Sequence, residues 1–214
     1  MSRRGKAVLA VSLLLAVLAL IGGVWLVSQV GARSLAEQMG VVEPRRPAYE
    51  VYAGEQFDGL PGADTVVIGD SHAEYGPWSE LLDEPVAVRG QAGATTAEVT
   101  GWAGDVPGST GRTLVLVGSN DVLQGRSPDT LRVDAETLYR SLPGHVVAVG
   151  VPPLVGLERE AAEANEALRE AATAAGAQWV NPTVALSGPG LVRQDGVHLT
   201  GHGYEVLADL LSNP

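Results

Sequence analysis

The sequence contains no cysteine and a single lysine, Lys6, and both facts narrow the possible chemistry. Without thiols, the chain has no disulfide scaffold, no cysteine nucleophile, no cysteine zinc ligands and no cysteine-linked lipid. Because the one lysine stands near the amino terminus, a Schiff-base lysine or a phosphate-loop lysine inside a folded domain is also excluded. Any catalysis therefore has to use the oxygen and nitrogen groups of other side chains.

Acidic residues are absent before Glu37, whereas Arg3, Arg4 and Lys6 stand at the amino terminus. The formal net charge is nevertheless −11 at pH 7, so the rest of the chain is strongly acidic. A surface of this sign repels phosphate backbones, which argues against nucleic acid as a partner. With 214 residues, 45% of them hydrophobic, the chain has room for one folded domain and one membrane or targeting segment.

Residues 7–30 form an apolar run whose only polar side chains are those of Ser12, Ser28 and Gln29. A helix of this length can span a bilayer, and the cationic residues before it predict a cytoplasmic amino terminus. We therefore expect a cytoplasmic basic segment over 1–6 and a transmembrane signal-anchor helix over 7–30, with the remainder extracytoplasmic. A cleaved secretory signal, which would leave the protein secreted, is the alternative.

Two regions follow the apolar run. Residues 31–61 contain three prolines and show no sustained periodicity, which predicts an extracytoplasmic linker. Over 62–214, short β-branched runs alternate with longer helical stretches, which is typical of βαβ units. We expect an α/β domain, a three-layer α/β/α sandwich with a mostly parallel five-stranded sheet. The expected strands are 64–68, 85–88, 113–117, 145–151 and 178–181, and the expected longer helices are 128–142, 157–175 and a last helix after Thr200.

Several polar side chains follow the expected strands at the point where each strand ends. Ser71 comes just after the first strand and Asn120 just after the third, while Gly93 lies in a glycine-rich turn after the second. Asp195 and His198 stand three residues apart, just before the last helix. Because sites in doubly wound sheets lie beyond the carboxyl ends of the strands, we expect these residues to meet at one rim.

These residue types supply the parts that acyl transfer requires. Ser71 would attack the ester, and His198 would take its proton and then protonate the leaving alcohol. Asp195 would hold the imidazole in the correct tautomer. The backbone N–H groups of Ser71 and Gly93 and the side-chain amide of Asn120 would form the oxyanion hole.

Four motifs in this order resemble the GDSL-type, or SGNH, hydrolases. They are Gly69-Asp70-Ser71, the turn at Gly93, Gly118-Ser119-Asn120-Asp121, which is similar to the family's GxND block, and Asp195-Gly196-Val197-His198-Leu199, which is similar to its DxxHL block. The resemblance covers the chain from Asp64 onward. It implies a flavodoxin-like sandwich with esterase, lipase, thioesterase or carbohydrate-esterase activity, and neither a metal nor an organic cofactor.

The sequence departs from the family pattern in two places. His72 stands where the family usually has leucine, and this variant resembles SGNH domains that act on bacterial envelope glycans. His72 is therefore a candidate substrate-binding residue at the mouth of the site. Arg89 stands where many members have asparagine, and either Gly90 or Gly93 could supply the oxyanion N–H, with the spacing favouring Gly93.

The expected function is that of a membrane-anchored extracytoplasmic serine esterase that cleaves a short acyl ester. The expected substrate is an O-acetylated carbohydrate or a lipid ester, with envelope glycan as the first choice. Two alternatives remain open: acyl transfer to an envelope glycan, and a non-catalytic glycan-binding domain of the same fold. A domain that only binds glycan does not need the Asp195 and His198 pair, which argues against the glycan-binding alternative. The sequence does not predict the oligomeric state.

Overall fold

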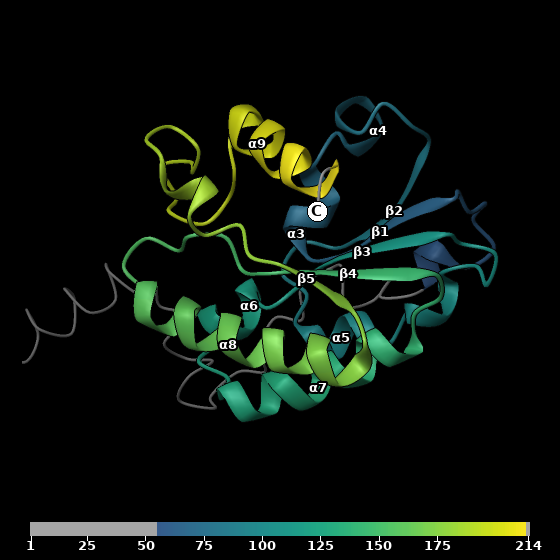
Figure 1. Ribbon diagram of the computed structural model, residues 1–214, viewed down its shortest axis with the longest axis horizontal. Helices are drawn as coiled ribbons and strands as arrows, with labels where there is room; N and C mark the ends of the chain where they lie inside the picture. The colour runs from purple at the N-terminus through teal and green to yellow at the C-terminus, as the bar shows by residue number, and fades with distance from the viewer. Residues whose placement is uncertain (1–54, 213–214) are drawn as a thin grey trace, which may run out of the picture. The chain divides into compact units, whose positions relative to one another are not determined.

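The computed structural model describes residues 55–212, which form a five-stranded sheet with helices on both faces (Figure 1). The strand order is β2-β1-β3-β4-β5, and all four neighbouring pairs are parallel. This confirms the expected α/β sandwich and its parallel sheet. The strands are β1 (Thr65–Gly69), β2 (Val86–Gly90), β3 (Arg112–Leu116), β4 (His145–Val149) and β5 (Gln178–Val180).

The helices form two layers, one on each face of the sheet (Figure 1). One layer contains α5 (Thr96–Thr100), α6 (Ser119–Leu123), α7 (Pro128–Ser141) and α8 (Glu158–Ala175). The other layer contains α3 (Ser71–Tyr75), α4 (Trp78–Leu81) and α9 (Gly201–Ser212).

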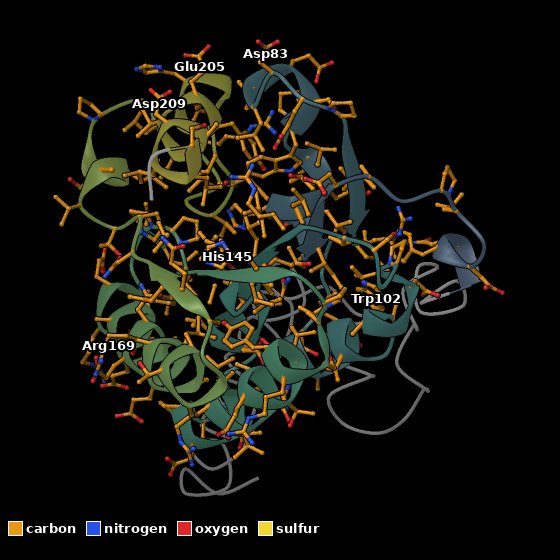
Figure 2. All side chains as sticks on the ribbon, turned by 45° about the vertical axis from the view of Figure 1, so that its right-hand side comes forward. Asp83, Trp102, His145, Arg169, Glu205 and Asp209 are labelled. Carbon is orange, nitrogen blue, oxygen red and sulfur yellow. The ribbon has the colours of Figure 1, made fainter. Side chains whose placement is uncertain are left out.

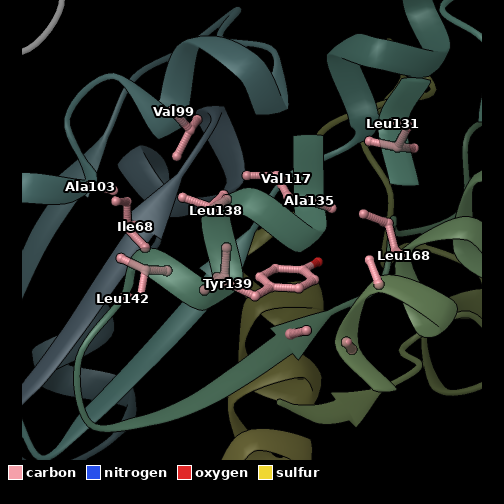
Figure 3. Close-up of a cluster of buried hydrophobic side chains, with 14 of the residues drawn as sticks. Ile68, Val99, Ala103, Val117, Leu131, Ala135, Leu138, Tyr139, Leu142 and Leu168 are labelled. Atoms are coloured by element: carbon pink, nitrogen blue, oxygen red, sulfur yellow. The ribbon is translucent and has the colours of Figure 1, made fainter. Parts of the chain in front are cut away.

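The long helix α7 shows why the sequence folds this way. Its buried residues Leu131, Ala135 and Leu138 recur at helical spacing, so they form one apolar stripe. Figure 3 shows part of the cluster in which this stripe packs with the strand residue Ile68. The side chain of Ser127 accepts the N–H of Thr130 and so caps the helix.

No helix among residues 55–212 combines the length and the apolar character needed to cross a membrane. The expected basic segment over 1–6, the transmembrane helix over 7–30 and most of the linker lie outside the described residues.

The folded domain begins before residue 62, which is earlier than expected. Phe57 is buried in the core, with its ring 5.9 Å from that of Trp102. The guanidinium of Arg89 lies over the Phe57 ring and donates to the backbone carbonyl of Pro61. These contacts fix the end of the expected linker to the domain.

Glycines bring the carboxyl ends of the strands close together at the rim. Gly69 ends β1 with a φ of 154°, and a Cβ there would collide with the backbone carbonyl of Leu116 on β3. Gly90 ends β2 against the backbone of Glu74 in α3, where a Cβ would also collide. His145, by contrast, is the first residue of β4, at the end of the sheet where the strands begin (Figure 2). The rim is therefore the place where the polar residues gather.

Candidate active site

Ser71 is the first residue of α3, directly beyond the carboxyl end of β1. The preceding residue, Asp70, caps this helix, because its carboxylate accepts the N–H of His72 at 2.8 Å. The N–H of Asp70 donates to the carbonyl of Leu116 on the neighbouring strand. The turn between β1 and α3 is thus held at both ends, and it places Ser71 at the rim.

Ser71, His198 and Asp195 form one hydrogen-bonded series. The Oγ of Ser71 lies 3.0 Å from Nε2 of His198, and Nδ1 of His198 lies 2.9 Å from Oδ2 of Asp195. The other oxygen of Asp195 accepts the N–H groups of Val197 and His198, each at 3.0 Å. In this arrangement the imidazole can take the serine proton while the carboxylate orients it.

The Asp195 carboxylate is held in its ionised form. The backbone N–H of Val197, the His198 side chain and the backbone N–H of His198 all lower the pKa of Asp195 well below its ordinary value. An ionised Asp195 favours a proton on Nδ1 of His198, which leaves Nε2 free to accept the Ser71 hydroxyl proton. The ionised Asp195 carboxylate therefore favours the tautomer of His198 in which Nε2 can act as the general base.

The expected oxyanion donors are the backbone N–H groups of Ser71 and Gly93 and the side-chain amide of Asn120. Within residues 55–212, neither the backbone N–H of Ser71 nor that of Gly93 has a hydrogen-bond partner. Gly93 lies in the turn with a φ of 83°, whereas Gly90 is the last residue of β2. The side-chain amide of Asn120 donates one hydrogen to the carbonyl of Ala94 at 2.9 Å, and its second hydrogen remains available.

Asp121 holds this part of the rim together, although the sequence reasoning did not single it out. One carboxylate oxygen accepts the N–H and the hydroxyl of Thr96 at 2.9 and 2.8 Å, and the other accepts Arg126 at 3.0 Å. Burial raises the pKa of Asp121, while the Thr96 bonds and the positive charge of Arg126 lower it. Asp121 thus fixes the start of α5, just after the Gly93 turn, to α6, which carries Asn120.

His72 does not line the substrate mouth, so that expectation is wrong. Its side chain is only 1% exposed. Nδ1 lies 3.3 Å from Oδ1 of Asp70, and Nε2 lies 3.1 Å from the carbonyl of Val197, next to His198. The ring turns inward because these two acceptors satisfy both of its nitrogens. His72 thus ties α3 to the loop that carries Asp195 and His198.

We expect His72 to make the stability of the protein depend on pH. Burial lowers the pKa of His72, but the Asp70 carboxylate and the Val197 carbonyl raise it, and the net pKa lies above the ordinary 6.5. A raised folded-state pKa means that the protonated ring stabilises the fold fully below about pH 6.5. This contribution disappears as the pH rises through the folded-state pKa. Thermal unfolding between pH 5.5 and 9 should show the loss.

The matched comparison is His72→Leu, which cannot titrate at this position. The difference in Tm between the wild type and His72→Leu should shrink as the pH rises. A difference that stays constant across the range would show that folding does not raise the pKa of His72.

Tyr75 is a further residue of the site that the sequence reasoning missed. It stands one helical turn after Ser71, half of its surface is exposed, and its ring centre lies 5.5 Å from that of His198. The spacing of four residues on a helix could have identified it.

The site shows no cluster of metal ligands. Among residues 55–212, no three His, Asp or Glu side chains gather as metal ligands would.

Solved structures share this fold. A Streptococcus pneumonia protein described as a candidate platelet activating factor aligns with a TM-score of 0.67 and 19% identity, over 90% of this chain and 97% of that chain. The M. smegmatis aryl esterase has a TM-score of 0.58 and 18% identity, over 69% and 95%. A carbohydrate acetylesterase family member from Sinorhizobium meliloti has a TM-score of 0.57 and 17% identity, over 69% and 94%. At these identities the likeness shows the fold.

The family assignment comes from the sequence match. No curated protein matches the chain significantly. Residues 53–206 match the GDSL-like lipase/acylhydrolase family. This match spans most of the chain, including every residue of the hydrogen-bonded series. The chain therefore belongs to the GDSL-like lipase/acylhydrolase family and is an ester hydrolase.

Proposed function

We propose that the protein is a serine esterase in which Ser71 is the nucleophile, His198 the general base and Asp195 the residue that orients His198. One observation carries the proposal: the continuous series of hydrogen bonds from Ser71 Oγ through the imidazole to the Asp195 carboxylate. If Ser71 only began a helix and His198 had only a structural role in its loop, such a series would not be required.

The reaction proceeds in two steps. Ser71 Oγ attacks the ester carbonyl while Nε2 of His198 takes its proton, and the resulting tetrahedral intermediate carries an oxyanion. The bond to the alcohol oxygen then breaks, and His198 gives its proton to that oxygen. Water next attacks the acyl-enzyme and passes a proton to His198. The acid is released and the proton returns to Ser71.

The oxyanion is stabilised by donors that are already in place. These are the N–H groups of Ser71 and Gly93, which have no partner among residues 55–212, and the second amide hydrogen of Asn120. Preorganised donors of this kind contribute about 3 to 4 kcal/mol each to the transition state. The bond from Asn120 to Ala94 keeps the amide next to the Gly93 turn, which limits the reorganisation during the reaction.

The proposed substrate is a short acyl ester, with an O-acetylated carbohydrate as the first choice and a lipid ester as the second. The side chains of His198 and Asp195 are 29% and 47% exposed, so the site is open to water. An open site favours hydrolysis over transfer of the acyl group to another alcohol. The fold shared with a carbohydrate acetylesterase family member is consistent with this choice.

We further propose that the enzyme is anchored in the membrane by residues 7–30 and that its domain is extracytoplasmic. The proposal rests on the length of the apolar run and on the cationic residues Arg3, Arg4 and Lys6 before it.

One experiment tests the substrate and the anchor together. Cells producing the full-length protein are separated into cytosol, membrane and medium, and each fraction is assayed with p-nitrophenyl acetate and p-nitrophenyl decanoate. We expect the activity in the membrane fraction, with the acetate ester preferred. Activity in the medium would indicate a cleaved signal, activity in the cytosol would contradict the anchor, and a preference for decanoate would contradict the short acyl group.

A further inference from the structure

The loop that carries Asp195 and His198 lies at the surface and bonds mainly to itself. Of residues 193–198, the first three are exposed and the other three are half-buried. The N–H of Arg193 donates to the carbonyl of His198, and the N–H of Gly196 donates to the carbonyl of Arg193. Such local bonds set the shape of the loop, whereas its position over α3 depends on contacts with other elements. A general base has to be held at a defined distance from the nucleophile, so these contacts matter for catalysis.

Two hydrogen bonds, besides the one to the nucleophile, connect residues 193–198 to other parts of the described chain. The carbonyl of Gly196 accepts the N–H of Val155, whose side chain is 70% exposed. The carbonyl of Val197 lies 3.1 Å from Nε2 of His72, whose side chain is 1% exposed. The first bond joins two surface loops. The bond from His72 is therefore the one that fixes the catalytic loop to the buried part of the domain.

The His72 bond is made to the peptide group that joins Val197 and His198. The carbonyl of this peptide faces Nε2 of His72, and its N–H donates to Oδ1 of Asp195 at 3.0 Å. The other oxygen of Asp195 lies 2.9 Å from Nδ1 of His198. The peptide is thus held from both sides, and hydrogen bonds that share a group polarise one another. One bond fixes the backbone that carries the imidazole, and the other fixes the carboxylate that orients it.

The surroundings of His72 keep a hydrogen on its Nε2. A carbonyl only accepts hydrogen bonds, so the bond to Val197 requires the hydrogen there. Nδ1 lies 3.3 Å from Oδ1 of Asp70 and 3.5 Å from Oγ of Ser119. A protonated ring donates from Nδ1 to the Asp70 carboxylate, and a neutral ring can accept the Ser119 hydroxyl there instead. In both states Nε2 remains the donor to the catalytic loop.

We propose that His72 is a positioning residue for the general base: its Nε2–H, by holding the carbonyl of Val197, keeps His198 at the distance that proton transfer requires. The inference rests on the proposed Ser71 and His198 chemistry. Because the side chain of His72 is buried, it does not contact the substrate, and its ring centre lies 5.8 Å from that of His198. His72 acts instead through the peptide between Val197 and His198.

The test measures kcat and KM for p-nitrophenyl acetate in the full-length wild type and in variants at position 72. His72→Leu keeps a side chain of similar size but has no donor. It should lower kcat about 10- to 100-fold with KM within about twofold, because a misplaced base slows the chemical step and leaves substrate binding intact. His72→Gln, whose amide nitrogen can replace Nε2, should restore kcat to within about fivefold of the wild type.

A third variant, His72→Asn, is polar but too short to reach the Val197 carbonyl. It should lose as much activity as His72→Leu, and it replaces that variant in the comparison if the leucine prevents folding. A His72→Gln protein that is folded and as slow as His72→Leu or His72→Asn would show that the donor is not what matters, and this would overturn the proposal.

Thr113→Val is the control for lost stability. Thr113 is buried near the start of β3, and its hydroxyl donates to the carbonyl of Pro143 at 2.8 Å. Valine removes one side-chain donor to a backbone carbonyl, as leucine does at position 72, but at the end of the sheet away from the rim. Both variants should lower the free energy of unfolding, and only His72→Leu should lower kcat. An equal loss of kcat in Thr113→Val would contradict a positioning role.

A double-mutant cycle shows whether His72 acts through the imidazole. In Asp195→Asn the imidazole of His198 already favours the wrong tautomer, so adding His72→Leu should lower kcat by less than about threefold more. Two losses that multiply, or a folded His72→Leu with the wild-type kcat, would overturn the positioning role and leave the esterase proposal intact. A folded wild type that did not hydrolyse p-nitrophenyl acetate would overturn both.

Discussion

Replacing Ser71 by alanine is expected to lower kcat for p-nitrophenyl acetate by about 10⁴- to 10⁶-fold. The hydroxyl is the attacking atom in the proposed mechanism, and no second serine hydroxyl lies within hydrogen-bond distance of the His198 imidazole in the described chain. Among residues 55–212 the Ser71 hydroxyl makes a hydrogen bond only to His198, so its removal should change the free energy of unfolding little. Steady-state kinetics and thermal unfolding measure the two effects separately.

The matched control is Ser187→Ala. Ser187 is exposed, and its hydroxyl donates only to the nearby carbonyl of Val184. This variant should keep the wild-type kcat. If Ser71→Ala were folded and retained more than about a hundredth of the wild-type rate, the nucleophile assignment would have to be abandoned.

Asp195→Asn is expected to lower kcat by about 10³- to 10⁴-fold with a smaller change in KM. An asparagine can still accept the N–H groups of Val197 and His198 through its oxygen. Its NH₂ group, however, would then face Nδ1 of His198 and favour the tautomer with the proton on Nε2. That tautomer cannot accept the Ser71 proton. Because Asp195 is half exposed, water can partly replace it, which places the loss below that for Ser71.

Asp209→Asn provides the control for this prediction. Asp209 is an exposed residue on α9, which shares a layer with the site (Figure 2). Its replacement removes one carboxylate and leaves every hydrogen bond of the series intact. Equal losses in Asp195→Asn and Asp209→Asn would mean that the overall charge matters and that the orientation of His198 does not.

Strands and long helices could be predicted because they carry a repeated pattern. The apolar run around Leu114 and the stripe through Leu131 and Leu138 each extend over several positions, and both elements lie where they were expected. The helices α4, α5 and α6 have at most five residues. Such helices complete little more than one turn, so they show no helical period in the sequence.

The approach of Ser71 to His198 could be predicted from a rule about sheets. Ser71 follows β1 and His198 precedes the last helix, and the connections beyond the carboxyl ends of the strands meet at one rim. The orientation of His72 could not be predicted in this way. Its partner Val197 lies 125 positions away in the chain, and only the folded turn brings that carbonyl within hydrogen-bond distance of Nε2.

The most direct test of the central claim is to react the full-length protein with a fluorophosphonate and to map the adduct by mass spectrometry. A fluorophosphonate forms a stable bond only with an activated serine, so we expect one adduct, on Ser71. We also expect none in Ser71→Ala and a much slower reaction in His198→Ala. A folded wild-type protein that remained unlabelled, or that carried the adduct on a different serine, would contradict the account.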